Sequence, residues 1–156
     1  MTGFSLVFGI LAVYFLFSNH SLFILFAALH LIADGLDGVI ARVSKSTIFG
    51  NYFEHICDGV VGLLVLIKIG MFTGDYLAYL IAGLYLLAQT THFSFLCQPP
   101  CLFTRTLTLI LAALFIPDTF PWSKYTLTVI ILINGVAYLY SLARQLQYFI
   151  IKFRSD

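Results

Sequence analysis

Charged residues are scarce in this sequence: they make up 10% of its 156 residues, and the net charge is only +1. Typical soluble domains carry about 25% charged residues. No stripe of basic residues runs along the chain, so a nucleic-acid partner is not indicated. Three cysteines, Cys57, Cys97 and Cys101, do not form the pattern of a disulfide framework. The first three residues carry no basic group, so we do not expect a cleaved signal peptide.

Apolar residues dominate the composition instead. They account for 61% of the chain, and the mean hydropathy is +1.00. A chain this apolar would expose large hydrophobic patches in water, which favours lipid as its solvent. There is no internal repeat or low-complexity linker, and the length suits one domain over residues 1–156. The sequence predicts an all-α integral membrane protein, because helices satisfy their own backbone hydrogen bonds in a bilayer.

Six apolar segments predict six transmembrane helices, joined by short polar or proline-containing connections. A span needs about 20 residues, and the first and fifth segments are shorter than that. The segments run over Phe4–Phe17, Leu22–Val43, Ile48–Phe72, Tyr76–Leu96, Leu102–Phe115 and Tyr125–Ile151.

The basic residues predict how the chain is oriented, because they gather on the cytoplasmic side of membrane proteins. A cytoplasmic amino terminus puts six of them inside and two outside. The inner set is Arg42, Lys45, Arg105, Arg144, Lys152 and Arg154, and the outer set is Lys68 and Lys124. This orientation places the connection between the second and third segments at the cytoplasmic surface.

Acidic residues are concentrated on the second and third segments. Four of the seven, Asp34, Asp37, Glu54 and Asp58, lie within 25 positions. An ionised side chain at the centre of a membrane helix costs about 2.5–3.5 kcal/mol. These carboxylates therefore need compensation by a cation, by water or by a basic residue such as Arg42.

Helical spacing suggests the form of that compensation. Asp34 and Asp37 share one helix face, and Glu54 and Asp58 share another. The short connection predicts that the two helices are antiparallel neighbours, so that all four carboxylates converge. Like charges at close range cannot all stay ionised alone. Ligation by oxygen alone favours Mg²⁺, Mn²⁺ or Ca²⁺ over zinc.

The same segment resembles the signature of the CDP-alcohol phosphotransferases. The pattern D-x2-D-G-x2-A-R-x7-G-x3-E-x3-D is formed by Asp34, Asp37, Gly38, Ala41, Arg42, Gly50, Glu54 and Asp58. The spacing agrees with the family throughout. The departure is Glu54, where the family has Asp, so this ligand is one methylene longer.

The resemblance implies a six-helix transferase with its site on the second and third helices. It implies that Asp34, Asp37 and Glu54 bind Mg²⁺ or Mn²⁺, and that Asp58 is the general base and also touches metal. Gly38, Ala41, Arg42 and Gly50 would bind the CDP group, and Arg105 would either bind a phosphate of the acceptor or anchor its helix.

In the implied reaction, the hydroxyl of a small polar alcohol attacks a CDP-linked lipid and CMP leaves. The residues do not identify the acceptor, and the donor lipid could carry diacylglycerol or archaeol. The reverse arrangement, in which a CDP-bound headgroup is transferred to a lipid alcohol, is also open. Family members are often homodimers, which this resemblance extends to the chain as an expectation.

Three other functions remain open at this point: a divalent-cation or proton transporter, a non-catalytic scaffold and an inactive family relative. A transporter would need polar residues toward the other membrane face, but Leu22–Leu29 and Val60–Ile67 are apolar apart from glycine. For His55 we expect a packing role. The cysteine spacing, with two prolines between Cys97 and Cys101, does not match a zinc site.

Overall fold

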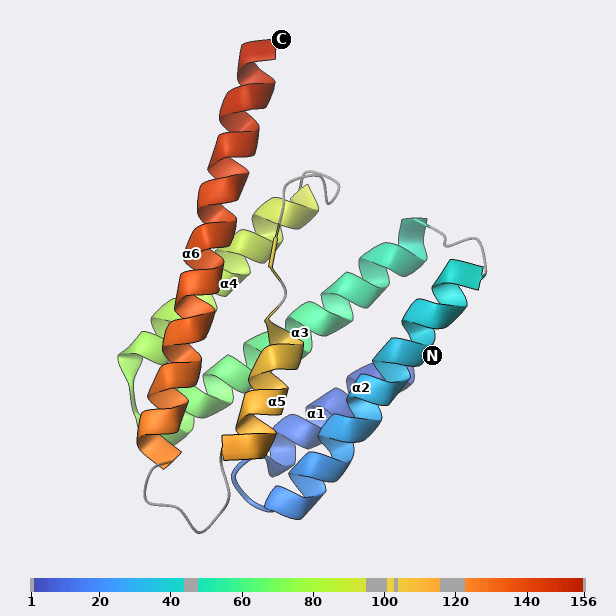
Figure 1. The fold of residues 1–156 in the computed structure, drawn as a ribbon, viewed down its shortest axis with the longest axis vertical. Helices are drawn as coiled ribbons and strands as arrows, with labels where there is room; N and C mark the ends of the chain where they lie inside the picture. The colour runs from blue at the N-terminus through green and yellow to red at the C-terminus, as the bar shows by residue number, and fades with distance from the viewer. Residues whose placement is uncertain (1, 44–47, 95–100, 103, 116–122, 156) are drawn as a thin grey trace.

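The computed structural model is built from α-helices (Figure 1). It describes residues 2–43, 48–94, 101–102, 104–115 and 123–155. The helices are α1 (Thr2–Phe15), α2 (His20–Val43), α3 (Ile48–Thr73), α4 (Tyr76–Ser94), α5 (Arg105–Phe115) and α6 (Ser123–Ser155). Within these ranges there is no strand, so the predicted all-α fold is confirmed.

The membrane character of the chain is also confirmed, while the number of spans stays a prediction. Three stretches in the described ranges are long and apolar enough to cross a bilayer: His20–Ile40, His55–Thr73 and Tyr125–Lys152. Two further apolar helices, Gly3–Phe15 and Arg105–Leu114, are shorter. Large hydrophobic side chains such as Leu25, Leu132 and Val136 are exposed on the outside of the bundle, as lipid contact requires.

Short polar side chains determine where two of the helices begin. The Asn19 side chain accepts a hydrogen bond from the backbone N–H of Leu22 (3.1 Å) at the start of α2. Asp75 accepts one from Leu77 (2.9 Å) at the start of α4. Between α3 and α4, Gly74 has a φ of 66°, a left-handed conformation that favours glycine and allows the tight turn.

The packing of α2 and α3 differs from the prediction. The two helices are antiparallel (Figure 1), but among the described residues they make no direct helix–helix contact. Instead α1 packs against both, and α5 reaches both from the other side while also contacting α6. Helix α4 completes the bundle between α3 and α6. The predicted antiparallel course is therefore present, but among the described residues the two helices are joined through α1 and α5 rather than by close approach of their backbones.

The apolar core lies where α1, α3, α4 and α6 meet. Its fully buried members include Leu16, Val61, Ile69, Tyr85 and Ile131. Helix α3 contacts α1, α4, α5 and α6, so this core holds it at the centre of the bundle. The acidic half of α3 is left to face α5 and α2.

Candidate functional site

Arg105 joins the two helices that carry the acidic motif. Its Nη2 donates to Asp34 on α2 at 2.6 Å, and its Nη1 donates to Asp58 on α3. The side chain of Arg105 is 5% exposed, against 26% for Asp34 and 17% for Asp58. A mostly buried guanidinium thus lies between two carboxylates that are far apart in sequence.

The positions of Asp34 and Asp58 can be compared with what a metal ion requires of its ligands. One oxygen of Asp34 and one of Asp58 already point at a single shared cationic group. Hard divalent cations prefer carboxylate oxygens of this kind. No group of three or more His, Cys, Asp or Glu residues suited to a metal occurs among the side chains that the structure describes. The observed pair therefore fits part of a ligand set, and the remaining ligands stay predictions.

The other motif residues are placed less completely. Asp37 lies one turn after Asp34 on α2, half-buried, with one carboxylate oxygen inside the protein. Gly50 is exposed in the first turn of α3. The side chains of Ala41, Arg42 and Glu54 lie outside what the structure describes, although their backbone belongs to α2 and α3.

The glycines that flank the acids fall into two kinds. A methyl group added at Gly35 or Gly38 on α2 would meet none of the atoms that the structure describes within 4 Å. On α3, a methyl group at Gly59 would lie 3.7 Å from the Tyr85 hydroxyl, and one at Gly62 would lie 2.9 Å from it. The α2 glycines therefore leave open space beside the acids, whereas those on α3 let α4 pack closely.

A polar stripe on α6, which we define as Asn134, Tyr138, Ser141 and Gln145, fixes the position of α5. All four residues are 1% exposed, and they follow each other at helical spacing along one face. Asn134 exchanges hydrogen bonds with Thr108 (2.9 and 3.1 Å) and accepts one from Thr104, the residue before Arg105. Tyr138 also contacts the Thr104 hydroxyl.

The rest of the stripe holds neighbouring chain segments. Ser141 accepts a hydrogen bond from the N–H of Leu102 (3.0 Å), and Gln145 donates one to the carbonyl of Ala88 (3.0 Å). Buried polar groups need such partners, and a satisfied network restricts how helices can slide. The stripe therefore anchors the start of α5, where Arg105 lies.

A second buried contact lies one turn before Asp34 on α2. His30, one turn earlier on α2, is 1% exposed. Its Nδ1 lies 2.9 Å from the Ser5 hydroxyl and 2.7 Å from the Ser5 carbonyl oxygen on α1. Gly9 permits this approach, because a methyl group there would be 3.1 Å from the same Nδ1. The contact ties α1 to the acidic end of α2.

The ring contact of His55 and the hydrogen bonds of Cys101 lie outside the pairing of Arg105 with the acids. The ring of His55 contacts that of His92 edge to face, with centroids 6.1 Å apart, which is a packing contact. Burial raises the pKa of the Cys101 thiol to about 11, so it stays protonated at neutral pH. Cys97 lies outside the described residues.

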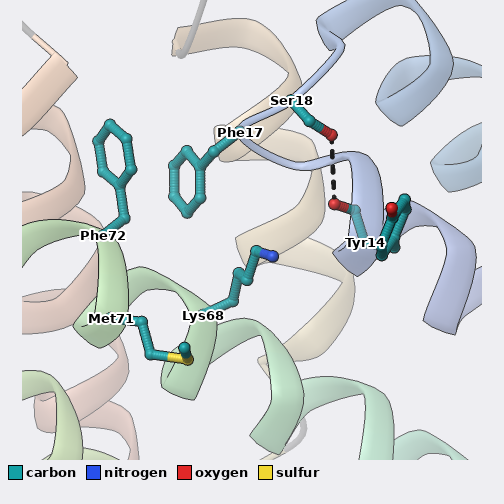
Figure 2. Close-up of a pocket in the computed structure, with 6 residues that line it drawn as sticks. All are labelled: Tyr14, Phe17, Ser18, Lys68, Met71 and Phe72. Carbon is teal, nitrogen blue, oxygen red and sulfur yellow. Dashed lines mark hydrogen bonds between the residues drawn. The ribbon is translucent and has the colours of Figure 1, made fainter.

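A pocket of about 280 Å³ lies at the other end of α1 and α3 (Figure 2). Lys68, ten residues after Asp58, faces the Tyr14 ring there at 5.9 Å. Phe17 and Phe72 stack beside it with centroids 4.0 Å apart. This pocket contains none of the motif residues. The Lys68 ammonium lies over an aromatic ring, a favourable contact for a cation.

Sequence reasoning missed the role of Arg105 as the partner of two motif acids. Arg42 was the expected neutralising residue because it is near in sequence, while Arg105 is 47 and 71 residues from its partners. The polar stripe was a signal that could have been found. Asn134, Ser141 and Gln145 interrupt an apolar segment at spacings of seven and four, which marks one face of a helix.

Comparison with known families agrees with the motif. A model of the CDP-alcohol phosphatidyltransferase family matches residues 1–152, which is nearly the whole chain and includes the segment from Asp34 to Asp58. Searches of curated proteins and of solved structures found no match. The family match favours a transferase over a cation or proton transporter. The chain therefore belongs to the CDP-alcohol phosphatidyltransferase family, whose members transfer phosphate-containing groups in phospholipid synthesis.

Proposed function

We propose that the chain transfers a phosphatidyl-type group from a CDP-linked lipid to a small polar alcohol, in a reaction that depends on Mg²⁺ or Mn²⁺. The observation that carries this proposal is the convergence of Asp34 and Asp58, from separate helices, on one cationic group. Such a pair can hold a divalent cation between α2 and α3. Phosphoryl transfer needs a cation at this kind of place to neutralise charge on the phosphate oxygens.

Each motif residue receives a role in this proposal. Asp34, Asp37 and Glu54 are metal ligands, and Asp58 is a ligand and the general base. Gly38 leaves open space on α2, which supports a CDP group lying close to that helix. Ala41 and Gly50 allow the same close approach. The guanidinium of Arg42 pairs with a phosphate.

The reaction exchanges one phosphorus–oxygen bond for another. The acceptor hydroxyl oxygen attacks the phosphorus that bears the lipid, and its proton passes to the Asp58 carboxylate. The bond from that phosphorus to the oxygen of CMP breaks, and CMP leaves with the electron pair. Asp58 lies on α3 beside the space between α2 and α3, where the acceptor hydroxyl would meet the phosphorus in this proposal.

The site opens to the cytoplasm in this proposal. Arg105 lies within the acidic site, so it no longer counts as an interfacial anchor. Five of the remaining basic residues still fall on the side of the α2–α3 connection, against two on the other, which supports a multi-pass protein in the predicted orientation. Homodimer formation remains a prediction from the family.

The test is release of CMP by the purified full-length protein in detergent. CDP-diacylglycerol and CDP-archaeol are each combined with a panel of alcohols, with Mg²⁺, with Mn²⁺ and with EDTA. Asp58→Asn serves as the inactive variant, and Asp75→Asn, which changes a helix-capping acid away from the site, serves as its matched control.

We expect CMP release that depends on metal and on one acceptor, persists in Asp75→Asn and is lost in Asp58→Asn. A second arm offers CDP-bound headgroups with diacylglycerol as the lipid alcohol, and CMP release in that arm alone would reverse the donor and acceptor. Release that is unaffected by EDTA, or retained in Asp58→Asn, would contradict the proposed chemistry.

A further inference from the structure

Arg105 fills the space between two acids that the proposed function makes metal ligands. Its two terminal nitrogens contact one oxygen of Asp34 and one of Asp58, the first and last acids of the motif. Among the residues whose burial the structure describes, Arg105 is the only Lys or Arg that is buried. Arg105 is the first residue of α5, and the hydrogen bond that Thr104 donates to Asn134 anchors this end of the helix. Its placement on the acids is therefore built into the fold.

A guanidinium and a divalent cation cannot both occupy this position. A cation that bridges Asp34 and Asp58 would lie in the space between them that the guanidinium fills, and two cations at contact distance in a mostly buried site repel each other strongly. Since α2 and α3 make no direct contact among the described residues, the guanidinium is also a physical link between them. Metal binding must therefore remove the guanidinium link between Asp34 and Asp58 and replace it with a link through the metal ion.

We propose that Arg105 is a resident counter-ion that competes with the divalent cation for Asp34 and Asp58, so that metal binds by displacing it. This inference rests on the proposed function, because it assumes that these acids are metal ligands. The competition lowers the affinity for metal, and the guanidinium keeps α2 joined to α3 when metal is removed.

The test measures metal affinity and thermal stability rather than activity. EDTA-treated full-length protein in detergent is titrated with Mn²⁺, which is followed by electron paramagnetic resonance of the free ion. Wild type is compared with Arg105→Gln, with Arg105→Lys and with the control Arg144→Gln. Arg144 is exposed on α6 and contacts Gln147 (3.1 Å), away from the acids.

We expect Arg105→Gln to bind Mn²⁺ about tenfold or more tightly than wild type, a factor equivalent to ~1.4 kcal/mol. Its unfolding temperature without metal should fall, because two carboxylates lose their partner, and Mn²⁺ should restore it. Arg105→Lys should also bind more tightly than wild type, since an ammonium cannot span both carboxylates as a planar fork does. Arg144→Gln should match wild type.

A purely structural role for Arg105 would lower the unfolding temperature without raising the affinity. Affinity for Mn²⁺ that is unchanged or weaker in both Arg105 variants would overturn the inference, and Arg105→Lys decides the matter if Arg105→Gln does not fold. If Mn²⁺ binds wild type and is lost in Asp58→Asn, the proposed function survives that result. If no form binds Mn²⁺, the proposed function itself fails.

Discussion

Gly9 on α1 is the position where an added methyl group should do most harm. A Cβ there would lie 2.6 Å from Cγ2 of Val61 on α3 and 3.1 Å from Nδ1 of His30 on α2. Neither neighbour can move easily, because Val61 is fully buried and β-branched and His30 is held by Ser5. Gly9→Ala must therefore push α1 away from the two helices that carry the acidic motif.

The magnitude follows from two opposing contributions. Replacing glycine by alanine inside a helix stabilises it by about 0.8–1 kcal/mol, while overpacking a well-packed core costs about 1–3 kcal/mol. Gly83→Ala on α4 is the matched control, because its methyl group would meet nothing within 4 Å. The helix contribution is common to both variants. Gly9→Ala should consequently be about 1–3 kcal/mol less stable than Gly83→Ala.

The measurement is the loss of helical circular dichroism as detergent micelles are titrated with a denaturing surfactant. Val61→Ala removes the clashing atom, so it should be less damaging in the Gly9→Ala background than alone, with a coupling of about 0.5–3 kcal/mol. Equal stability of Gly9→Ala and Gly83→Ala, with no coupling to Val61, would refute the reasoning that α1 packs against α3 at this point.

Three further predictions concern the site and its support. Glu54→Gln should abolish metal-dependent CMP release, while Glu54→Asp, which restores the family residue, should keep or raise it; equal rates in all three forms would remove Glu54 from the site. Asn134→Leu should lower the free energy of unfolding by about 1–3 kcal/mol, because Thr104 and Thr108 lose a buried partner, whereas Ile133→Leu on the exposed side of α6 should not, and equal unfolding midpoints would count against the network. Gly38→Leu should raise the KM for the CDP-linked donor without lowering the free energy of unfolding, since a Cβ at this position meets no described atom within 4 Å and leucine favours a helix more than glycine does; an unchanged KM would move the CDP group off α2.

The helices and the motif could be predicted from the sequence because they depend on local pattern. Apolar runs interrupted by Asn19, Gly74 and Asp75 mark the helix ends, and α2 and α3 extend close to their expected bounds. Differences are largest in α6, which the structure extends to Ser155, beyond the apolar run that ends at Ile151. Charged residues near the end of a helix continue its backbone hydrogen bonds without adding hydropathy.

The relation between α2 and α3 could not be predicted in the same way. A short connection requires the two helices to be close at one end, but it does not determine whether they pack along their length. That is decided by α1 and α5, which lie on either side and contact both. For the same reason the pairing of Arg105 with Asp34 and Asp58 was not foreseen. It depends on where the α6 stripe fixes α5, which is a property of the whole bundle.

Locating the metal itself would show most directly whether Asp34 and Asp58 bind a divalent cation. Crystals of the protein soaked with Mn²⁺ and measured at the manganese absorption edge would give an anomalous peak at each bound ion. We predict a peak between α2 and α3, about 2.0–2.3 Å from oxygens of Asp34 and Asp58, because hard divalent cations bind carboxylate oxygens at such distances. A peak elsewhere, or none at saturating Mn²⁺ with Arg105 still on both carboxylates, would contradict it.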